Sequence, residues 1–346
     1  MVNTLNIGNH SLGDAVYVIA EVGGNHNGDP DAAYRLVEAA AAAGANAVKF
    51  QTYKAETLVH PDQEPLPIVR KSYKTQLERF RSLELPWEVY ESIMSMCRNL
   101  GIDFMTSPFD LGILDQMAPH MPAVKIASGD LTYHQLIKAA VATGKPVILS
   151  TGMADLNEIH AAAALIPVAQ RVLLHCVSVY PLPDDQTNLR AINALQAAFP
   201  DTLIGYSDHT IGPEACLAAV ALGARLVEKH FTLDTSQRPG DHVLSLDPTG
   251  MAEMVKQIRR IEAMLGEPVK RPAPGEVDMR QWMRRGVYAA HELHEGTELS
   301  ASDLLYVRPQ SSYSPFDEAT LVGRRALRSI SAFEALSREA LSGDNG

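Results

Sequence analysis

Two histidines stand at positions where a metal ion could be held between neighbouring strands. His209 in GYSDHTIG and His230 in RLVEKH each end a short apolar run. Imidazole is a common ligand of divalent ions, and carboxylates such as Glu21 and Asp241 could join the shell while positions stay open for water or substrate. A single histidine is usually an ordinary buried polar residue, but two at matching strand ends favour a shared ion.

Two lysines end apolar runs in the same way, Lys49 in NAVKFQ and Lys125 in AVKIA. Lysine is rarely buried without a partner, so an inward-facing pair indicates an anion between them. Serine hydroxyls at other strand ends could donate to its phosphate or carboxylate: Ser107, Ser128, Ser150 and Ser207. Strand-end lysines of barrel enzymes can also form Schiff bases, and spacing does not decide between an anion site and a lysine-dependent aldolase.

The elements that carry these residues alternate between short apolar runs and longer amphipathic segments, which predicts repeated β-then-α units. The runs cover 16–20, 46–51, 102–106, 123–127, 146–150, 171–176, 202–207 and 225–230. This number of units over roughly 250 residues fits a (β/α)8 TIM barrel, in which all carboxyl strand ends meet at one face. The alternative is an open doubly wound sheet, but no G-x-G-x-x-G follows the first run.

The chain changes character after the last amphipathic segment. Residues 1–266 are predicted to form the barrel, and 267–284, rich in proline and charge, to form a linker. Residues 285–346 show short strand-like pieces separated by turns and are interpreted as a small second domain. With 346 residues, 46% of them hydrophobic, the chain can bury a large core.

Composition also narrows the partners and the compartment. A net charge of -11 argues against a surface made to attract nucleic acid or an anionic membrane. The three cysteines are widely spaced without a CxxC, which favours the reducing cytoplasm over a disulfide framework. Neither a signal peptide nor an apolar run of membrane-spanning length is recognisable, so we expect a cytoplasmic protein.

An ordered series of motifs carries a family resemblance. YVIAEVGGNHNGD, FMTSPFD, VKIASGD, VILSTGM, HCVSVYPLP, GYSDHTIG, VEKHFTLD and GDHVLSLDP resemble the motifs of the sialic acid synthase family between about Tyr17 and Pro248. GVYAAHELHEGTELSASDLLYVRP resembles the antifreeze-like SAF domain, a β-clip, that follows the barrel in this family. The resemblance implies condensation of phosphoenolpyruvate with an N-acylated amino-hexose and water, giving a nine-carbon 2-keto sugar acid and phosphate.

The resemblance also implies roles for individual residues. Glu21, Lys49 and Lys125 match catalytic residues, while His209 and His230 match ligands of Mn2+, Mg2+ or another divalent ion; no organic cofactor is expected. The positions that match substrate-binding residues are Gln51, Ser107, Ser128, Ser150, Ser178, Tyr180, Ser207, Asp241 and Arg308. In the family's homodimers the antifreeze-like domain caps the partner's barrel, and Arg308 matches the arginine that reaches the sugar there.

The acceptor sugar is less defined. GDHVLSLDP, with histidine after its aspartate, resembles the sialic and legionaminic branches more than the pseudaminic branch. Between these two, N-acetylmannosamine is favoured, and 2,4-diacetamido-2,4,6-trideoxymannose, the legionaminic precursor, is the alternative. N-acetylmannosamine 6-phosphate is a third possible acceptor. Three other functions are also considered: a phosphoenolpyruvate-dependent synthase of another sugar acid, such as a 3-deoxy-octulosonate type, a Schiff-base aldolase, and an ice- or carbohydrate-binding protein without activity.

Overall fold

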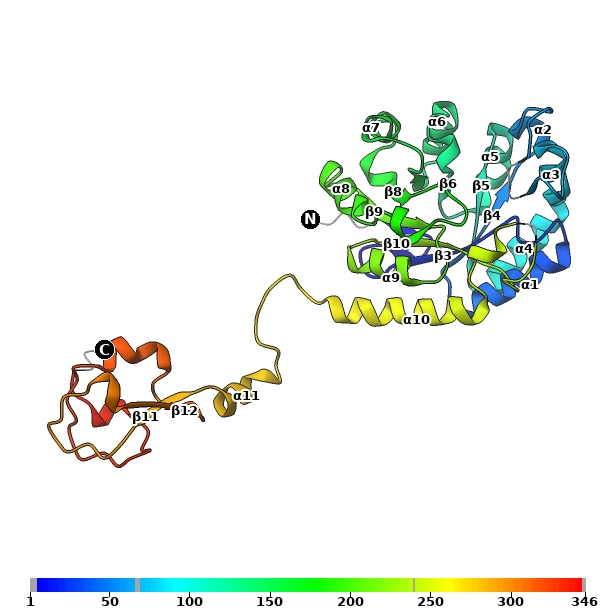
Figure 1. The fold of residues 1–346 in the computed structure, drawn as a ribbon. Coiled ribbons are helices and arrows are strands. Elements are labelled where there is room, and N and C mark those ends of the chain that lie inside the picture. Colours follow the sequence, from blue (N-terminus) through cyan, green and yellow to red (C-terminus); the bar gives the residue numbers. More distant parts are fainter. Residues whose placement is uncertain (1–4, 66–68, 239, 344–346) are drawn as a thin grey trace. The chain divides into compact units, whose positions relative to one another are not determined.

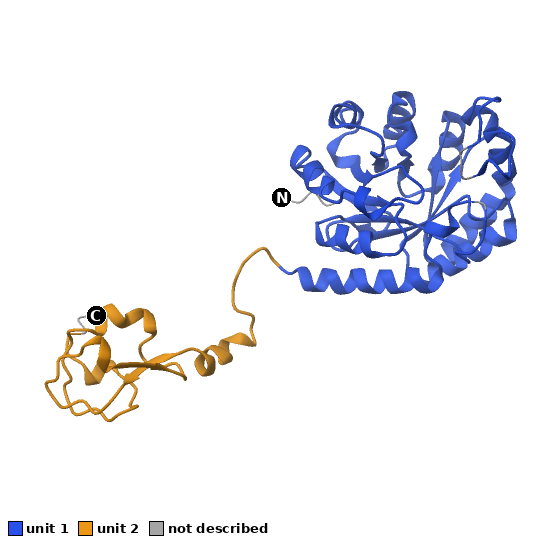
Figure 2. Ribbon diagram, in the orientation of Figure 1, with its two compact units in different colours: residues 1–266 blue, residues 267–346 orange. Residues whose placement is uncertain are grey.

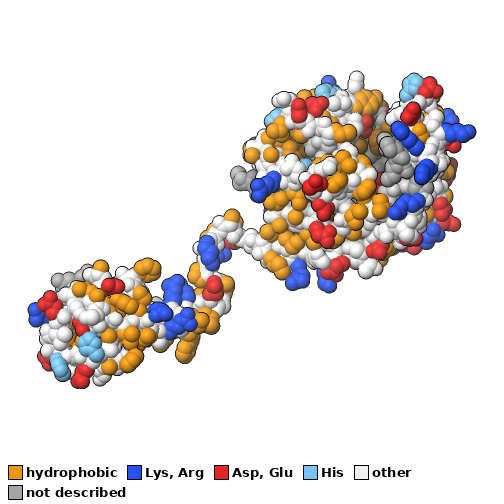
Figure 3. Space-filling model, in the orientation of Figure 1, with side chains coloured by type: hydrophobic (Ala, Val, Ile, Leu, Met, Phe, Trp, Pro, Cys, Tyr) orange, Lys and Arg blue, Asp and Glu red, His pale blue; other side chains and the backbone are white. Residues whose placement is uncertain are grey.

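The computed structural model describes residues 5–65, 69–238 and 240–343, which fall into two compact units. The first unit is Met1–Gly266 and the second is Glu267–Gly346 (Figure 2). The first unit is a ring of parallel strands surrounded by helices (Figure 1). On its visible face, acidic and basic side chains are interspersed (Figure 3).

The first unit is a nearly closed, parallel, eight-stranded barrel. Its strands are β3 (Tyr17–Gly23), β4 (Ala47–Thr52), β5 (Asp103–Pro108), β6 (Val124–Ile126), β7 (Val147–Ser150), β8 (Arg171–Cys176), β9 (Leu203–Asp208) and β10 (Leu226–His230). The order is β5-β4-β3-β10-β9-β8-β7-β6, and β5 contacts β6 at the remaining gap. The predicted barrel is therefore confirmed. The doubly wound alternative is wrong, because its strand order would reverse along the sheet.

Helices follow the strands and cover the outside of the barrel (Figure 1). They are α1 (Pro30–Ala42), α4 (Trp87–Leu100), α5 (Leu111–Met117), α6 (His134–Ala142), α7 (Leu156–Ala163), α8 (Ala191–Ala198), α9 (Glu214–Ala221) and α10 (Pro248–Leu265), with α2 (Ala55–Leu58) and α3 (Gln76–Leu83) inserted before α4. The start of α1 follows from sequence: the Asp29 side chain accepts from the Asp31 amide at 3.0 Å, and Pro30 is the first helical residue.

Side-chain alternation along the strands fills the barrel interior. An apolar cluster at the amino ends of the strands includes Tyr17, Ile19 and Ala47, and the hairpin β1 (Asn6–Ile7) with β2 (His10–Ser11) contributes Ile7 to it. Successive strand residues point to opposite faces, so residues two positions later also point inward. At the carboxyl ends of the strands the inward-pointing residues are polar. The barrel interior therefore has a polar layer at the carboxyl ends next to the apolar cluster at the amino ends.

The second unit has its own small core. It contains α11 (Glu276–Met283), α12 (Glu318–Leu321) and an antiparallel pair of strands, β11 (Gly286–Ala289) and β12 (Leu304–Val307). Val287, Leu293 and Ile330 are among its buried residues. Helix α11 falls inside the segment that the sequence suggested as a linker. None of the helices formed by the described residues is both long and apolar enough to cross a membrane.

Candidate active site

Four charged side chains meet inside the barrel at the carboxyl ends of its strands. Lys49 Nζ lies 2.6 Å from Glu21 Oε2 and 3.6 Å from Glu228 Oε2. Lys125 Nζ lies 3.8 Å from Glu228 Oε1 and donates to Ser150 Oγ at 2.7 Å. These four charged side chains are at most 7% exposed. Glu228 therefore lies between the two lysines, and Lys49 joins Glu228 to Glu21.

Burial and ion pairing shift the pKa values of these four groups in opposite directions. Burial raises the pKa of Glu21 above its ordinary value, although Lys49 opposes this. Burial would also raise the pKa of Glu228, but Lys125 and Lys49 outweigh it and lower that pKa to about 2. Burial lowers the pKa of Lys125, whereas the carboxylates beside Lys49 overcome burial and raise the pKa of Lys49. Glu228 is thus held as a carboxylate, and Glu21 is the more readily protonated acid.

Hydroxyl groups surround this centre. Ser107 Oγ accepts from Lys49 Nζ at 3.4 Å, and Ser207 Oγ donates to Glu228 Oε1 at 2.9 Å. Ser178 Oγ is buried without a hydrogen-bond partner among the described residues. An unpartnered buried hydroxyl in a polar cavity is a position where a ligand oxygen could bind.

Gly152 allows two of these hydroxyls to approach each other. Its amide donates to Ser128 Oγ at 3.0 Å. A Cβ built on Gly152 would lie 2.4 Å from Ser178 Oγ and 2.8 Å from Ser128 Oγ. The two hydroxyls therefore border one small space, which any side chain at this position would enter.

The two histidines are neighbours at the ends of β9 and β10. Their ring centroids are 5.3 Å apart. His209 Nδ1 lies 2.7 Å from the Val177 carbonyl, so Nδ1 carries the proton and Nε2 has a free lone pair. His230 is buried, which lowers its pKa, and its Nδ1 has no hydrogen-bond partner among the described residues. Each ring thus has one nitrogen without a protein hydrogen bond among the contacts described above, which a metal ion could use.

The donor set fits a divalent ion with open coordination positions. Asp241 Oδ2 lies 3.9 Å from His230 Nδ1 and adds a carboxylate nearby. Within residues 5–65, 69–238 and 240–343, no three His, Cys, Asp or Glu side chains form a preformed metal cluster. An ion at this position would therefore rest on the two imidazoles and would take its other ligands from elsewhere, as catalytic metals commonly do.

Three of the residues expected near the sugar, Gln51, Tyr180 and Asp241, border the same centre. Gln51 Nε2 donates to Glu21 Oε1 at 2.8 Å, and the Tyr180 ring lies 4.0 Å from that of His209, centroid to centroid. Asp241 begins the 3-10 turn η6 (Asp241–Leu244) beside His230. Arg308 belongs to the second unit, where it is exposed and its Nη1 lies 3.8 Å from Met283 Sδ.

The sequence patterns led to no role for Glu228. The available signal was its place two residues before His230, on the same inward face of β10. A carboxylate in an apolar run needs a buried partner, and the two lysines that supply it come from β4 and β6.

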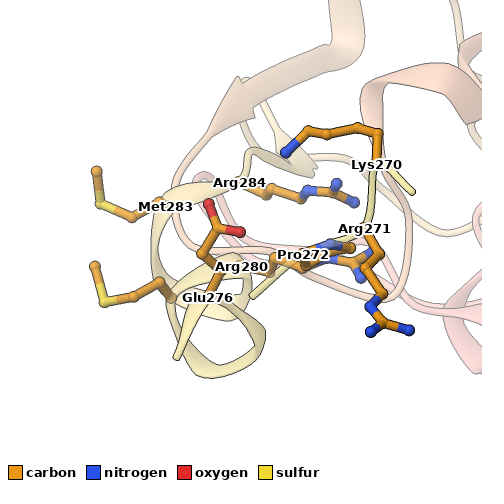
Figure 4. Close-up of a pocket in the computed structure, with 8 residues that line it drawn as sticks. Lys270, Arg271, Pro272, Glu276, Arg280, Met283 and Arg284 are labelled. Carbon is orange, nitrogen blue, oxygen red and sulfur yellow. The ribbon is translucent and has the colours of Figure 1, made fainter. Parts of the chain in front are cut away.

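A separate hollow of about 500 Å3 lies in the second unit. It is bordered by exposed side chains of α11, of the segment before it and of the residue that follows it, and several of them are basic (Figure 4). They are Lys270, Arg271, Pro272, Glu276, Met279, Arg280, Met283 and Arg284. None of the predicted site residues lines this hollow, and the buried barrel centre is the better candidate site.

A parallel barrel with ionisable groups gathered at its carboxyl strand ends has the organisation of a barrel enzyme. Residues 36–270 match the model of the NeuB family. The N,N'-diacetyllegionaminic acid synthase of Legionella pneumophila is 37% identical over 327 residues, covering 91% of this chain and 92% of that protein. The N-acetylneuraminate-9-phosphate synthase of Homo sapiens is 33% identical, covering 93% and 92%.

A solved structure agrees with these relatives. The N-acetylneuraminic acid (sialic acid) synthetase of Leptospira borgpetersenii has a TM-score of 0.72 and 32% identity, covering 81% of this chain and 95% of that one. This chain belongs to the NeuB family. The resemblance to sialic acid synthases found in the sequence is thereby confirmed.

Proposed function

We propose that this protein condenses phosphoenolpyruvate with an N-acylated amino-hexose and water, giving a nine-carbon 2-keto sugar acid and phosphate. The observation that carries the proposal is the buried centre in which Lys49 and Lys125 lie among serine hydroxyls beside two imidazoles. The names of the family relatives, which are synthases of sialic and legionaminic acids, support the same class of product.

The lysines and hydroxyls suit a small substrate with two anionic groups. Lys125 Nζ donates to Ser150 Oγ at 2.7 Å and to the Ile126 carbonyl at 3.2 Å, while its nearest carboxylate oxygen is 3.8 Å away. An ammonium group has three N–H donors, so Lys125 can still donate to a ligand. Ser178 Oγ offers an unused donor near Ser128. Phosphoenolpyruvate, which carries a phosphate and a carboxylate, matches such donors.

His209 and His230 are the proposed ligands of Mn2+, Mg2+ or another divalent ion. Such an ion would supply Lewis-acid polarisation of the open-chain sugar aldehyde. Val177 fixes the His209 ring by accepting from Nδ1 at 2.7 Å, which keeps Nε2 available. The proposed chemistry needs no organic cofactor.

Glu21 is the proposed acid-base group. In the reaction, the electron pair of the C2=C3 double bond of phosphoenolpyruvate forms a bond from C3 to the aldehyde carbon. The C=O double bond of the aldehyde becomes single, its oxygen takes up one proton, which balances the proton released by water, and the water oxygen adds at C2, where positive charge develops. The Glu21 carboxylate can stabilise that charge and accept a proton from the water. Its pKa, raised by burial, suits a group that gains a proton during the reaction. The C2–O bond to phosphate then breaks while the C2 hydroxyl gives up its proton and becomes the ketone, and the lysines can hold the departing phosphate anion, which carries that proton away.

The second unit is proposed to be the antifreeze-like domain of a homodimer that caps the partner's barrel. The support is the motif resemblance together with the exposed Arg308, whose guanidinium has a sulfur as its hydrogen-bond partner. Arg308→Ala is expected to raise the KM for the sugar while the KM for phosphoenolpyruvate changes little. The cytoplasm is the proposed compartment, in keeping with three buried free cysteines.

N-acetylmannosamine is the favoured acceptor, and the legionaminic precursor is the second candidate because the Legionella relative carries that name. The test is phosphate release by metal-stripped protein, with Mn2+ restored, from phosphoenolpyruvate and each of three sugars: N-acetylmannosamine, its 6-phosphate and 2,4-diacetamido-2,4,6-trideoxymannose. Release with one sugar, loss of release with chelator, and a product mass equal to sugar plus pyruvate would establish class and substrate.

Release with none of these sugars would sink the proposal in this form. The aldolase hypothesis has its own readout, because borohydride traps a Schiff base between lysine and a keto acid. The proposal expects no covalent adduct after borohydride treatment with pyruvate, and a mass increase on Lys49 or Lys125 would favour the aldolase.

A further inference from the structure

A second buried ion pair lies outside the barrel interior, directly behind the two histidines. Lys229 Nζ is 2.6 Å from Asp208 Oδ2, and both side chains are fully buried. Asp208 and Lys229 are directly paired in the register between β9 and β10. Each precedes a histidine, His209 or His230, by one position. The pair therefore joins the two strand positions that carry the imidazoles.

Further hydrogen bonds close this network around the backbone of His209. Asp208 Oδ1 accepts from Tyr206 Oη at 2.9 Å and from the Thr210 amide at 2.9 Å. Lys229 Nζ also donates to the Thr210 carbonyl, so the residues on both sides of His209 are tied to β10. The Thr210 amide and the Asp208 carboxylate thus both have hydrogen-bond partners, and these bonds restrict the turn that follows β9.

The pair is poorly explained as a device for stability alone. Two charges buried together often contribute no more than apolar residues of similar volume, whereas the loss of one partner is costly. Alternation places Asp208 and Lys229 on the outer face of their strands, away from Glu228 and His230, which face inward. They cannot reach a substrate in the centre and can act only through the positions of other residues.

We propose that the Asp208–Lys229 pair is a positioning device that sets the spacing between His209 and His230 and thereby the affinity of the site for a divalent ion. The inference rests on the proposed function, in which these histidines hold the ion. Outer groups that orient metal ligands typically change metal affinity about 10–100-fold when removed. We expect a loss of Mn2+ affinity of about tenfold or more in variants that lack the pair.

The principal variant is the double substitution Asp208→Asn with Lys229→Met, which removes both charges while nearly keeping the volumes. Mn2+ binding is measured by the electron paramagnetic resonance signal of free ion, and phosphoenolpyruvate binding by calorimetry without metal. The inference predicts a folded protein by circular dichroism, Mn2+ binding weakened about tenfold or more, and phosphoenolpyruvate affinity within about twofold of wild type. Should the double variant not fold, Asp208→Glu, which keeps both charges but changes the length of the pair, is measured with the same expectation.

Two results would overturn the inference about the ion pair while leaving the proposed metal site standing. One is a folded variant that binds Mn2+ as tightly as wild type, and the other is an equal loss of Mn2+ and phosphoenolpyruvate affinity, which would indicate general damage to the barrel. His209→Ala is the reference variant, expected to bind Mn2+ more weakly than the double variant. If wild type bound no Mn2+, or bound it equally well after His209→Ala, the proposed metal site would fail and the inference with it.

Discussion

Replacing Lys49 with methionine should destabilise the barrel more than replacing Lys49 and Glu21 together. Lys49 Nζ lies 2.6 Å from Glu21 and 3.6 Å from Glu228, and both carboxylates are at most 7% exposed. Removing one partner of a buried pair typically costs about 3–5 kcal/mol, because the other charge is left uncompensated. In Lys49→Met/Glu21→Gln the glutamine keeps an oxygen that can accept from Gln51, and Glu228 keeps Lys125 and Ser207 as partners.

The double substitution should therefore restore about 2 kcal/mol relative to Lys49→Met, within the usual range for residues in contact. The free energy of unfolding can be measured by urea titration near pH 7, with Glu21→Gln completing the cycle. Trp87, at the start of α4, reports on the barrel when Trp282, 70% exposed in the second unit, is replaced by phenylalanine. A double variant no more stable than Lys49→Met would refute the role assigned to the pair.

Three further predictions concern burial, space and charge. Burial lowers the pKa of His26 from 6.5 to about 4. The stabilisation contributed by neutral His26 is therefore fully present above pH 6.5 and decreases as the pH falls, by about 2 kcal/mol at about pH 5. Urea unfolding above pH 6.5 and at about pH 5 should show this loss of stability in wild type but not in His26→Asn. Equal losses in the two proteins would contradict the prediction. In Gly152→Ala the new Cβ would lie 2.4 Å from Ser178 Oγ, and calorimetry should show the Kd for phosphoenolpyruvate raised about tenfold. Gly129→Ala is the control, because its Cβ would have no atom within 4 Å, and it should leave this Kd unchanged. Lys125→Met should raise the same Kd about 100-fold, and a Kd within about twofold of wild type would exclude a contact with the ligand.

The barrel and most of its inner polar groups could be predicted because two simple rules apply together. Parallel strands bring their carboxyl ends to one face, and alternation assigns each side chain to the inside or the outside. Lys49, Lys125 and His230 lie on the inner face for this reason, and His209 follows β9 directly. The strand bounds also agree with the apolar runs to within three residues, the largest difference being the end of β3.

The ion pairs between side chains of different strands could not be predicted from the sequence in the same way. The partners of Glu228 come from β4 and β6, far away along the chain, and the Asp208–Lys229 pair depends on the register of β9 against β10. Neither follows from periodicity, which assigns a face but no neighbour. The helix α11 was missed because proline and charge in that segment outweighed the periodicity of eight residues.

We propose that the charged centre of the barrel binds phosphoenolpyruvate and that the neighbouring histidines hold the metal. The most direct test is diffraction from crystals grown with phosphoenolpyruvate and Mn2+, with an anomalous difference map to locate the ion. We expect the ligand's anionic groups within hydrogen-bond distance of Lys49 and Lys125, beside Glu228, and the anomalous peak between His209 and His230. Phosphoenolpyruvate bound away from both lysines, or a Mn2+ peak elsewhere with none at the histidines, would contradict the account.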